Sequence, residues 1–330
     1  MNGVTAGVEP RPDGKGPEYT VTRELALDPG ENTIEVVAYN GCGPSGCNLL
    51  ASLPASTTIK FTGPVDNIKP TLHVLAIGIN KYVDLGTPAE ARFKPLILAV
   101  DDAKAIGEAF EKAGLGMYNK IIVTPAYDAT KQGLEDIIGR LAGEIKPRDT
   151  FILFAAAHGA SENGRFYLIP KEFQTGPDAL AQQAIGQDLL QSWLARIKAK
   201  KALVLLDTCE SGALVAGYRR SRTDESASEA AVGRLHEATG RPVLTAAAYD
   251  QKASTGNNAA LGVGHGLFTW ALLDAFHYAE TSEPGIIRLN EIVAHVQKRV
   301  PEFAAKIAKP GQSARFGSRG EDFPLVNKLP

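Results

Sequence analysis

Hydrophobic residues follow two different patterns along the chain, and the change falls near residue 70. From residue 71 onward, apolar runs such as "TLHVLAIGIN", "FILFAAA" and "ALVLL" alternate with segments of helical spacing such as "LILAVDDAKAIGEAFEKAG". Uninterrupted apolar runs are typical of strands buried on both faces of a sheet. Alternating strands and helices are typical of a parallel sheet between two helix layers. Residues 71–330 are therefore predicted to form an α/β domain with a mostly parallel central sheet and helices on both faces.

The individual elements follow from the same pattern. The predicted strands cover residues 71–80, 119–125, 149–157, 201–207 and 241–248. The predicted helices cover residues 96–114, 129–145, 185–199, 266–276 and 289–307. In a sheet of this kind, functional residues gather at the carboxyl ends of the strands.

Residues 1–65 instead predict a small antiparallel β segment. "YTVTRELAL" and "NTIEVVAYN" are short and rich in β-branched residues, "DPGE" links them as a tight turn, and "STTIKF" and "NGVTAGV" read as further strands. The pattern resembles the closing strands of a bacterial immunoglobulin-like sandwich, which usually has about seven strands. We expect either part of a larger sandwich, with upstream domains of a longer protein, or strands that pack on the second domain. Residues 66–70 are interpreted as a linker.

Charge and hydropathy exclude several classes of partner. The formal net charge is −2, so the chain has no electrostatic case for binding nucleic acid or an anionic membrane. No apolar run reaches the length of a membrane span, and the first residues lack the pattern of a secretory signal. We therefore expect a cytoplasmic protein without membrane or nucleic-acid partners.

Two predicted strands end in reactive residues. "FILFAAA" runs into His158 and Gly159, and "ALVLL" runs into Asp207 and Cys209. If the two strands are neighbours, the imidazole and the thiol project from the same edge of the sheet. A thiol with an ordinary pKa of about 8.5 becomes a good nucleophile when an imidazole accepts its proton. The backbone N–H groups of Gly159 and Cys209 are natural donors to a developing oxyanion.

Each of these residues also has a structural explanation. A lone cysteine at a strand end is usually a packing residue, and a lone histidine there is usually a satisfied polar group. Their occurrence together at matching strand ends favours the functional interpretation. The other two cysteines, Cys42 and Cys47, lie in the turn "NGCGPSGCN" and are interpreted as loop thiols, because their spacing fits neither a redox pair nor a zinc site.

The ordered motifs resemble a known family. "FAAAHGASENGRFYLIP" and "LVLLDTCESG" resemble the His-Gly and Asp-x-Cys-x-Ser-Gly motifs of caspase-like peptidases, and the bacterial metacaspase-like branch is the nearest in pattern. "HVLAIGINKY", "LAVDDAKAIGEAF" and "GLFTWALLDAF" resemble further family elements in the right order, so the resemblance covers residues 71 to about 326. It implies a caspase-like fold.

The resemblance also implies a role for each candidate residue. His158 would be the general base, Cys209 the nucleophile, and the amides of Gly159 and Cys209 the oxyanion hole, with no third orienting residue required. Asp207 matches an acid that lines the first specificity pocket in metacaspases, and a carboxylate there fits cleavage after Arg or Lys. Asp250, in "AAAYDQKAS", matches a second polar position near that pocket. The alternatives are a turn-capping acid at Asp207 and a solvated loop acid at Asp250.

Two positions depart from the family pattern. Ala157 stands where the family usually has Gly, and we expect its methyl group to tighten the turn before His158. Lys252 lies beside Asp250 and could neutralise the pocket. The departure at Ala157 supports an alternative function, a non-catalytic scaffold or interaction module, and a second alternative is a peptidase that prefers Asp before the cut.

Residues 218–240 are small, polar and charged, which predicts a mobile exposed loop. Caspase-like enzymes often cut themselves in this segment, so with an acidic pocket the candidate self-cleavage sites are Arg219, Arg220 and Arg222. The alternative is a plain surface loop.

The resemblance requires no cofactor, and the expected partner is a protein or peptide substrate. Nearby acids in the family sometimes serve calcium, so a calcium requirement stays open, without support from this sequence. Asp101 and Asp102 are interpreted as acids that favour a helix N-terminus. His265, in "GHGLF", is interpreted as a cap or loop residue. The prediction is thus a cysteine endopeptidase that cuts after Arg or Lys.

Overall fold

The structure is a computed structural model of the chain. It describes residues 30–36, 52–63, 68–83, 93–162, 165–210, 240–248, 264–306, 312–318 and 322–330, together with the isolated positions 22, 25, 27, 38 and 235. In these parts of the chain, no helix is both long and apolar enough to cross a membrane.

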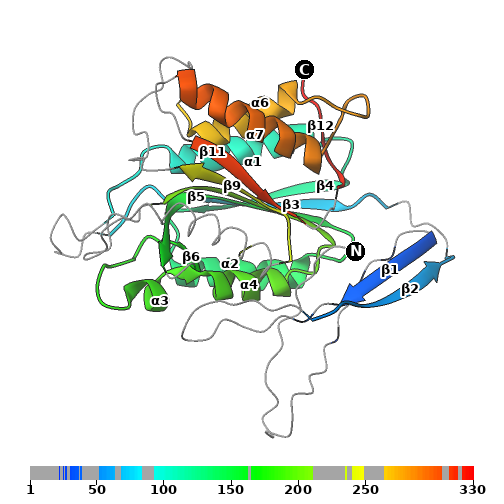
Figure 1. The fold of residues 1–330 in the computed structure, drawn as a ribbon, viewed down its shortest axis with the longest axis horizontal. Coiled ribbons are helices and arrows are strands. Elements are labelled where there is room, and N and C mark those ends of the chain that lie inside the picture. Colours follow the sequence, from blue (N-terminus) through cyan, green and yellow to red (C-terminus); the bar gives the residue numbers. More distant parts are fainter. Residues whose placement is uncertain are drawn as a thin grey trace, which may run out of the picture.

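A mostly parallel sheet forms the centre of the molecule (Figure 1). From edge to edge its strands are β11 (Gln312–Gly317), β9 (Val243–Ala248), β8 (Lys201–Glu210), β5 (Thr150–Glu162), β3 (Thr71–Gly78) and β4 (Lys120–Tyr127). The five strands from β9 to β4 are parallel to one another, and β11 is antiparallel to β9. The predicted parallel sheet is confirmed.

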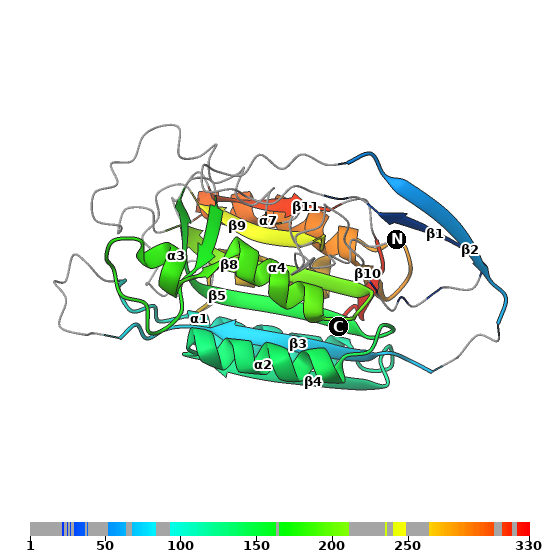
Figure 2. The same cartoon turned by 90° about the horizontal axis from the view of Figure 1, so that it is seen from below.

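Helices cover both faces of this sheet, as predicted. One layer consists of α1 (Ala99–Ala113), α6 (Leu267–Tyr278) and α7 (Leu289–Lys306), above the sheet in Figure 1. The other layer contains α2 (Lys131–Glu144) and α4 (Gln187–Arg196), which lie in front of the sheet in Figure 2. Right-handed crossovers place helices on opposite faces where the strand order reverses direction. Here the chain runs from β3 out to β4 and then back to β5, so both faces are covered.

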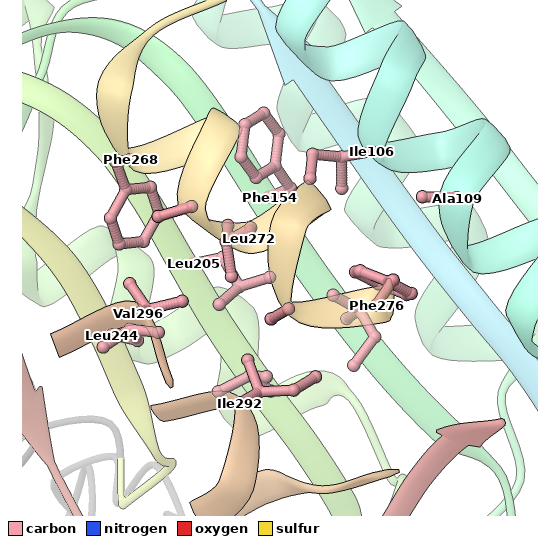
Figure 3. Packing of buried hydrophobic residues seen from close by; sticks show 14 of the residues in the cluster. Ile106, Ala109, Phe154, Leu205, Leu244, Phe268, Leu272, Phe276, Ile292 and Val296 are labelled. Carbon is pink, nitrogen blue, oxygen red and sulfur yellow. The ribbon is translucent and has the colours of Figure 1, made fainter. Parts of the chain in front are cut away.

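The core divides into two large clusters because strand side chains alternate between the faces. Phe154 and Leu205 pack toward α1, α6 and α7, together with Phe268 and Leu272 (Figure 3). Leu153 and its counterparts on the neighbouring strands pack toward α2 and α4. A fully buried Phe or Leu contributes about 1.5–3 kcal/mol, so these two layers hold the sheet between the helices.

Strands β5 and β8 are longer than the sequence pattern predicts. The predicted strands end at Ala157 and Asp207, but β5 continues to Glu162 and β8 to Glu210. The expected turn before His158 is therefore wrong, since Ala157 lies within extended β5 and is buried against the α2 and α4 layer. Strand pairing explains the difference, because β6 (Arg165–Leu168) and β8 supply partners for the polar continuation of β5.

Several short elements have no clear counterpart in the sequence pattern. They are β6, α3 (Ala179–Gln183), β7 (Ile185–Gly186), β10 (Ile286–Arg288), β11 and β12 (Pro324–Asn327). β10 and β12 pair with each other as a separate two-stranded sheet. Segments this short contain too few residues to show a hydrophobic period. They form through contacts with neighbouring elements.

The N-terminal region contributes one antiparallel pair, β1 (Gly30–Val36) and β2 (Ala55–Phe61). The pair lies beside the α/β domain, at the right in Figures 1 and 2. Along β2 the side chains are exposed except for the partly buried Phe61. The antiparallel prediction agrees with this pair, and the larger sandwich stays a prediction, since the proposed strands 2–8 and 19–27 lie largely outside the described residues.

Gly78, the last residue of β3, lets the first turn of α1 pack directly against the strand. A Cβ atom added there would lie 2.5 Å from the Ala99 carbonyl oxygen and 2.7 Å from the Val100 Cα atom. Both are backbone atoms, so the helix itself would have to move. Helix α1 also carries residues of the candidate site, and its close approach therefore sets part of the site's geometry.

We predict that Gly78→Ala lowers the free energy of unfolding by about 1–3 kcal/mol, the usual range for forcing extra volume into a packed region. Urea unfolding followed by circular dichroism measures the change. Gly143→Ala in α2 is the matched control, because a Cβ atom there meets nothing within 4 Å and alanine favours a helix. Equal stability of the Gly78→Ala variant and the wild type would contradict the close-packing interpretation.

Candidate active site at the carboxyl edge of the sheet

His158 and Cys209 are direct partners in adjacent parallel strands. The register of β5 and β8 pairs Ala156 with Asp207, His158 with Cys209, and Gly159 with Glu210. Register partners in a parallel pair lie on the same face of the sheet. The structure thus brings the two backbone positions together, as the sequence predicted, while the Cys209 side chain lies outside the described parts of the structure.

The His158 side chain is held on several sides. It is 6% exposed, and its ring centroid lies 4.9 Å from those of both Tyr82 and Phe93. Its Nε2 atom lies 2.8 Å from the Lys94 carbonyl oxygen. The His158 backbone N–H donates to the Tyr82 hydroxyl oxygen at 2.9 Å. These contacts come from two segments, one after β3 and one before α1.

This environment selects the form of the imidazole. Burial lowers the pKa of His158 below its usual value, and the hydrogen bond to the Lys94 carbonyl opposes that shift in part. The ring is therefore neutral at pH 7. Because a carbonyl oxygen can only accept, Nε2 must carry the proton, which leaves Nδ1 as the basic nitrogen. A neutral imidazole with one defined basic nitrogen is what a general base requires.

Gly159 lies where a larger residue would be crowded. An added Cβ atom would lie 3.1 Å from the Thr208 Cβ atom and 3.3 Å from the Phe166 ring. Glycine is thus favoured here by the packing of β5 against β6 and β8. Its role in an oxyanion hole stays a prediction.

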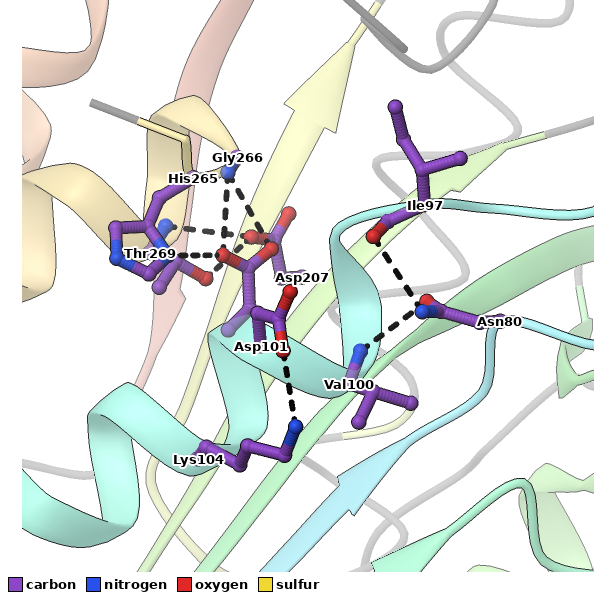
Figure 4. A network of polar contacts seen from close by, with 10 residues as sticks. Asn80, Ile97, Val100, Asp101, Lys104, Asp207, His265, Gly266 and Thr269 are labelled. Atoms are coloured by element: carbon purple, nitrogen blue, oxygen red, sulfur yellow. Dashed lines mark hydrogen bonds and ion pairs between the residues drawn. The ribbon is translucent and has the colours of Figure 1, made fainter. Parts of the chain in front are cut away.

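Asp207 projects toward the N-terminus of α6. Its Oδ2 atom accepts a hydrogen bond from the Thr269 hydroxyl at 2.6 Å and another from the Thr269 backbone N–H at 3.2 Å (Figure 4). The carboxylate is therefore anchored to a helix N-terminus, where a negative charge is favoured. The expected alternative of an acid that caps the turn after β8 is wrong, because β8 continues past Asp207 and the partner is a different element.

His265 and Gly266 lie beside Asp207 (Figure 4), and Asp102 bonds both of them. His265 places Nδ1 2.7 Å from the Asp102 Oδ1 atom, and the Gly266 backbone N–H lies 3.3 Å from both Asp102 oxygens. A Cβ atom added to Gly266 would lie 2.8 Å from Asp207 Oδ2 and 3.2 Å from Asp102 Oδ2. Both carboxylates therefore converge on Gly266, which has to lack a side chain.

Burial and mutual repulsion set the charge of this group. Burial, and then the neighbouring Asp102 charge, raise the pKa of Asp207 to about 7, against the opposing effect of the Thr269 hydrogen bonds. Burial also raises the pKa of Asp102, although its hydrogen bond with His265 acts in the other direction. The hydrogen bond to Asp102 raises the pKa of His265. The protonation of each of these three groups therefore depends on the charge of its neighbours.

Asp102 and His265 were not assigned to the site from the sequence, where Asp102 was interpreted as a helix-start acid and His265 as a cap or loop residue. Both interpretations describe their local positions correctly. The signal that locates them is topological: α1 and α6 follow the parallel strands β3 and β9, so their N-termini lie at the carboxyl edge of the sheet.

The remaining candidate residues cannot be located. Asp250, Lys252 and most of the loop 218–240 lie outside the described residues, as do the self-cleavage candidates Arg219, Arg220 and Arg222. Within the parts of the chain that are described, no group of three His, Cys, Asp or Glu side chains could hold a metal ion.

Comparison with known proteins gives the family. A search of the curated proteins finds no match. Among solved structures, a Geobacter sulfurreducens protein is 17% identical, with 79% of this chain and 98% of that chain covered and a TM-score of 0.49. The Drosophila initiator caspase Dronc is 12% identical, with 81% and 90% covered and a TM-score of 0.47. The family model described as "Caspase domain" matches residues 71–319, so this protein belongs to the caspase domain family.

Proposed function

We propose that this protein is a cysteine endopeptidase that hydrolyses peptide bonds after Arg or Lys, with Cys209 as the nucleophile and His158 as the general base. The observation that carries the proposal is the register of β5 and β8, which makes these two residues partners. Membership of the caspase domain family supports the same reaction class. The substrate would be a protein or peptide.

The reaction follows from the form of the imidazole. His158 Nδ1 accepts the thiol proton, and the Cys209 sulfur attacks the peptide carbonyl carbon. The N–H groups of Gly159 and Cys209 stabilise the oxyanion. The protonated His158 then gives its proton to the leaving amine, which leaves a thioester. A water molecule, deprotonated by His158, hydrolyses the thioester and releases the acid and the free thiol.

The acidic group beside the two strands supports the basic preference. Asp207 lies two residues before Cys209, and Asp102 adds a second carboxylate at the same place. With both acids ionised and His265 protonated, the group keeps a net negative charge, which would pair with the Arg or Lys of a substrate. A peptidase that prefers Asp would need a cationic pocket, and the acids found here argue against it.

The scaffold alternative loses the feature that favoured it. That feature was the expected strain at Ala157, and the residue instead lies in regular, buried β5. A histidine with a purely structural role would not need a neutral ring with one defined basic nitrogen, as His158 has. The alternative is decided by whether Cys209 reacts.

We predict that Cys209→Ala lowers cleavage of a peptide with a single Arg by about 10³-fold or more, since the nucleophile is lost. His158→Ala should lower it by about 10²–10⁴-fold. A fluorogenic peptide assay measures both. Cys42→Ala, which removes a thiol outside the matched domain, is the control and should cleave normally. Wild-type activity in the Cys209→Ala variant, or a wild type that neither cleaves nor is labelled by a basic peptide halomethyl ketone, would favour the scaffold.

We predict that kcat/KM for an Arg peptide rises with pH through about 7. The sign follows from Asp207, which is neutral below its pKa of about 7 and becomes a carboxylate above it. Asp207→Asn should abolish the rise of kcat/KM near pH 7. The rise at lower pH that follows deprotonation of His158 should remain. Asp101→Asn is the control, because Asp101 lies next to Asp102 in α1 but is exposed and bonds Lys104. A peptide panel that varies only the residue before the cleaved bond tests which type of residue is preferred there. Cleavage only after Asp would overturn the basic preference.

We predict that the wild-type chain cuts itself at Arg219, Arg220 or Arg222. The segment follows Cys209 closely and offers the basic residues that an acidic pocket would accept. Mass spectrometry of the purified chain should show fragments ending at these residues. The Cys209→Ala variant should stay whole, and a variant with all three changed to Gln should remain whole yet cleave an added Arg peptide. Cutting that persists in Cys209→Ala would point to a contaminating protease.

A further inference from the structure

The Lys94 carbonyl fixes which His158 nitrogen carries the proton, and the segment that carries this carbonyl is itself held from elsewhere. The segment comprises residues 93–98. It begins with Phe93, which packs against the imidazole, and ends where α1 starts. Residues 93–98 do not form a strand of the main sheet. Phe93 packs on Tyr82 and Phe173, and Leu96 packs on the core. The hydrogen bonds to Leu96 N–H and to the Ile97 carbonyl come from Asn80, just after β3.

Asn80 uses all four of its polar groups. Its backbone C=O accepts from the Leu96 N–H at 2.8 Å, and its side-chain Nδ2 donates to the Ile97 carbonyl at 3.4 Å. Its Oδ1 accepts from the Val100 N–H at 3.1 Å (Figure 4). Its backbone N–H donates to Asp128 Oδ1 at 2.8 Å. Two of these bonds tie the segment before α1 to the end of β3, and a third ties the first turn of α1 to the same place.

The contact with Val100 replaces a missing cap. The N-cap residue of α1 is Leu98, whose side chain makes no capping hydrogen bond. A helix leaves its first backbone N–H groups without partners inside the helix, and a polar side chain normally accepts from one of them. Asn80 supplies that acceptor from a different element. The start of α1 and the segment before it are thus tied to one side chain.

Asp128 fixes Asn80 in turn. It follows β4 and has a φ of 48°, in the left-handed region that asparagine and aspartate tolerate best among non-glycine residues. From there its Oδ1 accepts from the N–H groups of both Asn80 and Lys81, at 2.8 and 2.9 Å. The chain leaving β3 is therefore anchored to the end of the neighbouring strand.

We propose that Asn80 is a positioning residue for the catalytic base: it holds residues 93–98 so that the Lys94 carbonyl keeps the proton of His158 on Nε2 and leaves Nδ1 basic. The inference rests on the proposed function of His158 as a base. The hydrogen bonds of Asn80 run to Leu96, Ile97, Val100 and Asp128, so its effect on the imidazole is indirect. Its effect passes through Leu96 and Ile97 to Lys94, two residues away from Leu96.

The groups around the imidazole make this effect distinct from general stability. Tyr82 and Phe93 face the ring, the Lys94 carbonyl faces Nε2, and β8 brings Cys209 beside it in register. Of these contacts, Phe93 and Lys94 belong to the segment that Asn80 holds. If that segment moves, the ring becomes more exposed to water and loses its tautomer constraint, while Tyr82 and β5 stay in place.

The test measures the ring directly. The full chain is labelled with ¹⁵N-histidine, and His158→Gln identifies the His158 signals among the six histidines. The wild type should show one neutral tautomer, protonated at Nε2, with a pKa below 6.5. Asn80→Ala should show a mixture of tautomers and a pKa nearer 6.5, with kcat/KM for an Arg peptide lowered by about 10- to 100-fold, the usual cost of misplacing a catalytic group.

Asn80→Asp keeps the acceptor for Val100 but places a carboxylate oxygen against the Ile97 carbonyl. It should fold and still show the second tautomer, so the test holds even where Asn80→Ala unfolds. Thr130→Ala is the matched control: it removes the side-chain cap of α2, to which the Gly133 N–H donates at 3.0 Å, at a helix start outside the segment 93–98. It should lower the urea midpoint and leave the tautomer unchanged.

A folded Asn80→Asp variant with the wild-type tautomer would overturn the proposal, as would a tautomer change of equal size in Thr130→Ala. The tautomer is read without any substrate. A wild type that cleaves no peptide but shows the Asn80-dependent tautomer would therefore reject the proposed function and leave the positioning role supported.

Discussion

The parallel pairing of β5 with β8 is the constraint on which the candidate site depends. Ten register pairs run from Thr150 and Lys201 to Gly159 and Glu210, and the last of them lie beyond the apolar core. A slip of one residue would turn every side chain of a strand to the opposite face. Burial on both faces prevents such a slip, because apolar residues upstream fill both core clusters. Packing of the core thus fixes the strand register, and the register keeps His158 opposite Cys209 several residues beyond the core.

Two environments at this edge tune ionisable groups in different ways. His158 is enclosed by aromatic rings and one carbonyl, so burial favours its neutral form and the carbonyl selects one nitrogen. Asp207 and Asp102 are both buried, which raises the pKa of each, and the Asp102 charge raises that of Asp207 further. Hydrogen bonds from Thr269 to Asp207 and between His265 and Asp102 act in the other direction. The chemistry proposed for the site needs both results: a neutral base, and a carboxylate group that becomes negative near neutral pH.

Several groups at this edge are held by elements that follow different strands. The start of α1 carries Asp102 and is capped by Asn80 from the end of β3, and Asn80 is anchored by Asp128 from the end of β4. The start of α6 carries His265 and Thr269 on either side of Gly266. Because parallel strands and the helices after them meet at one edge, the topology gathers these residues from positions 80 to 269 of the chain.

The sequence by itself determined the layers and the order of the main strands and helices, because uninterrupted apolar runs and helical spacing are local signals. It also placed His158 and Cys209 at the common edge where parallel strands end, but that their strands are neighbours in this register came from the structure. Only the tertiary structure decided that β5 and β8 continue past their apolar residues, that Asp207 bonds α6, and that Asp102, His265 and Asn80 belong to the site. Polar residues carry no period of their own, so their partners depend on contacts between segments that are distant in the sequence. A strand can be extended by pairing with its neighbours, and a helix can be capped by a residue of another element. Neither effect is visible in the local sequence pattern.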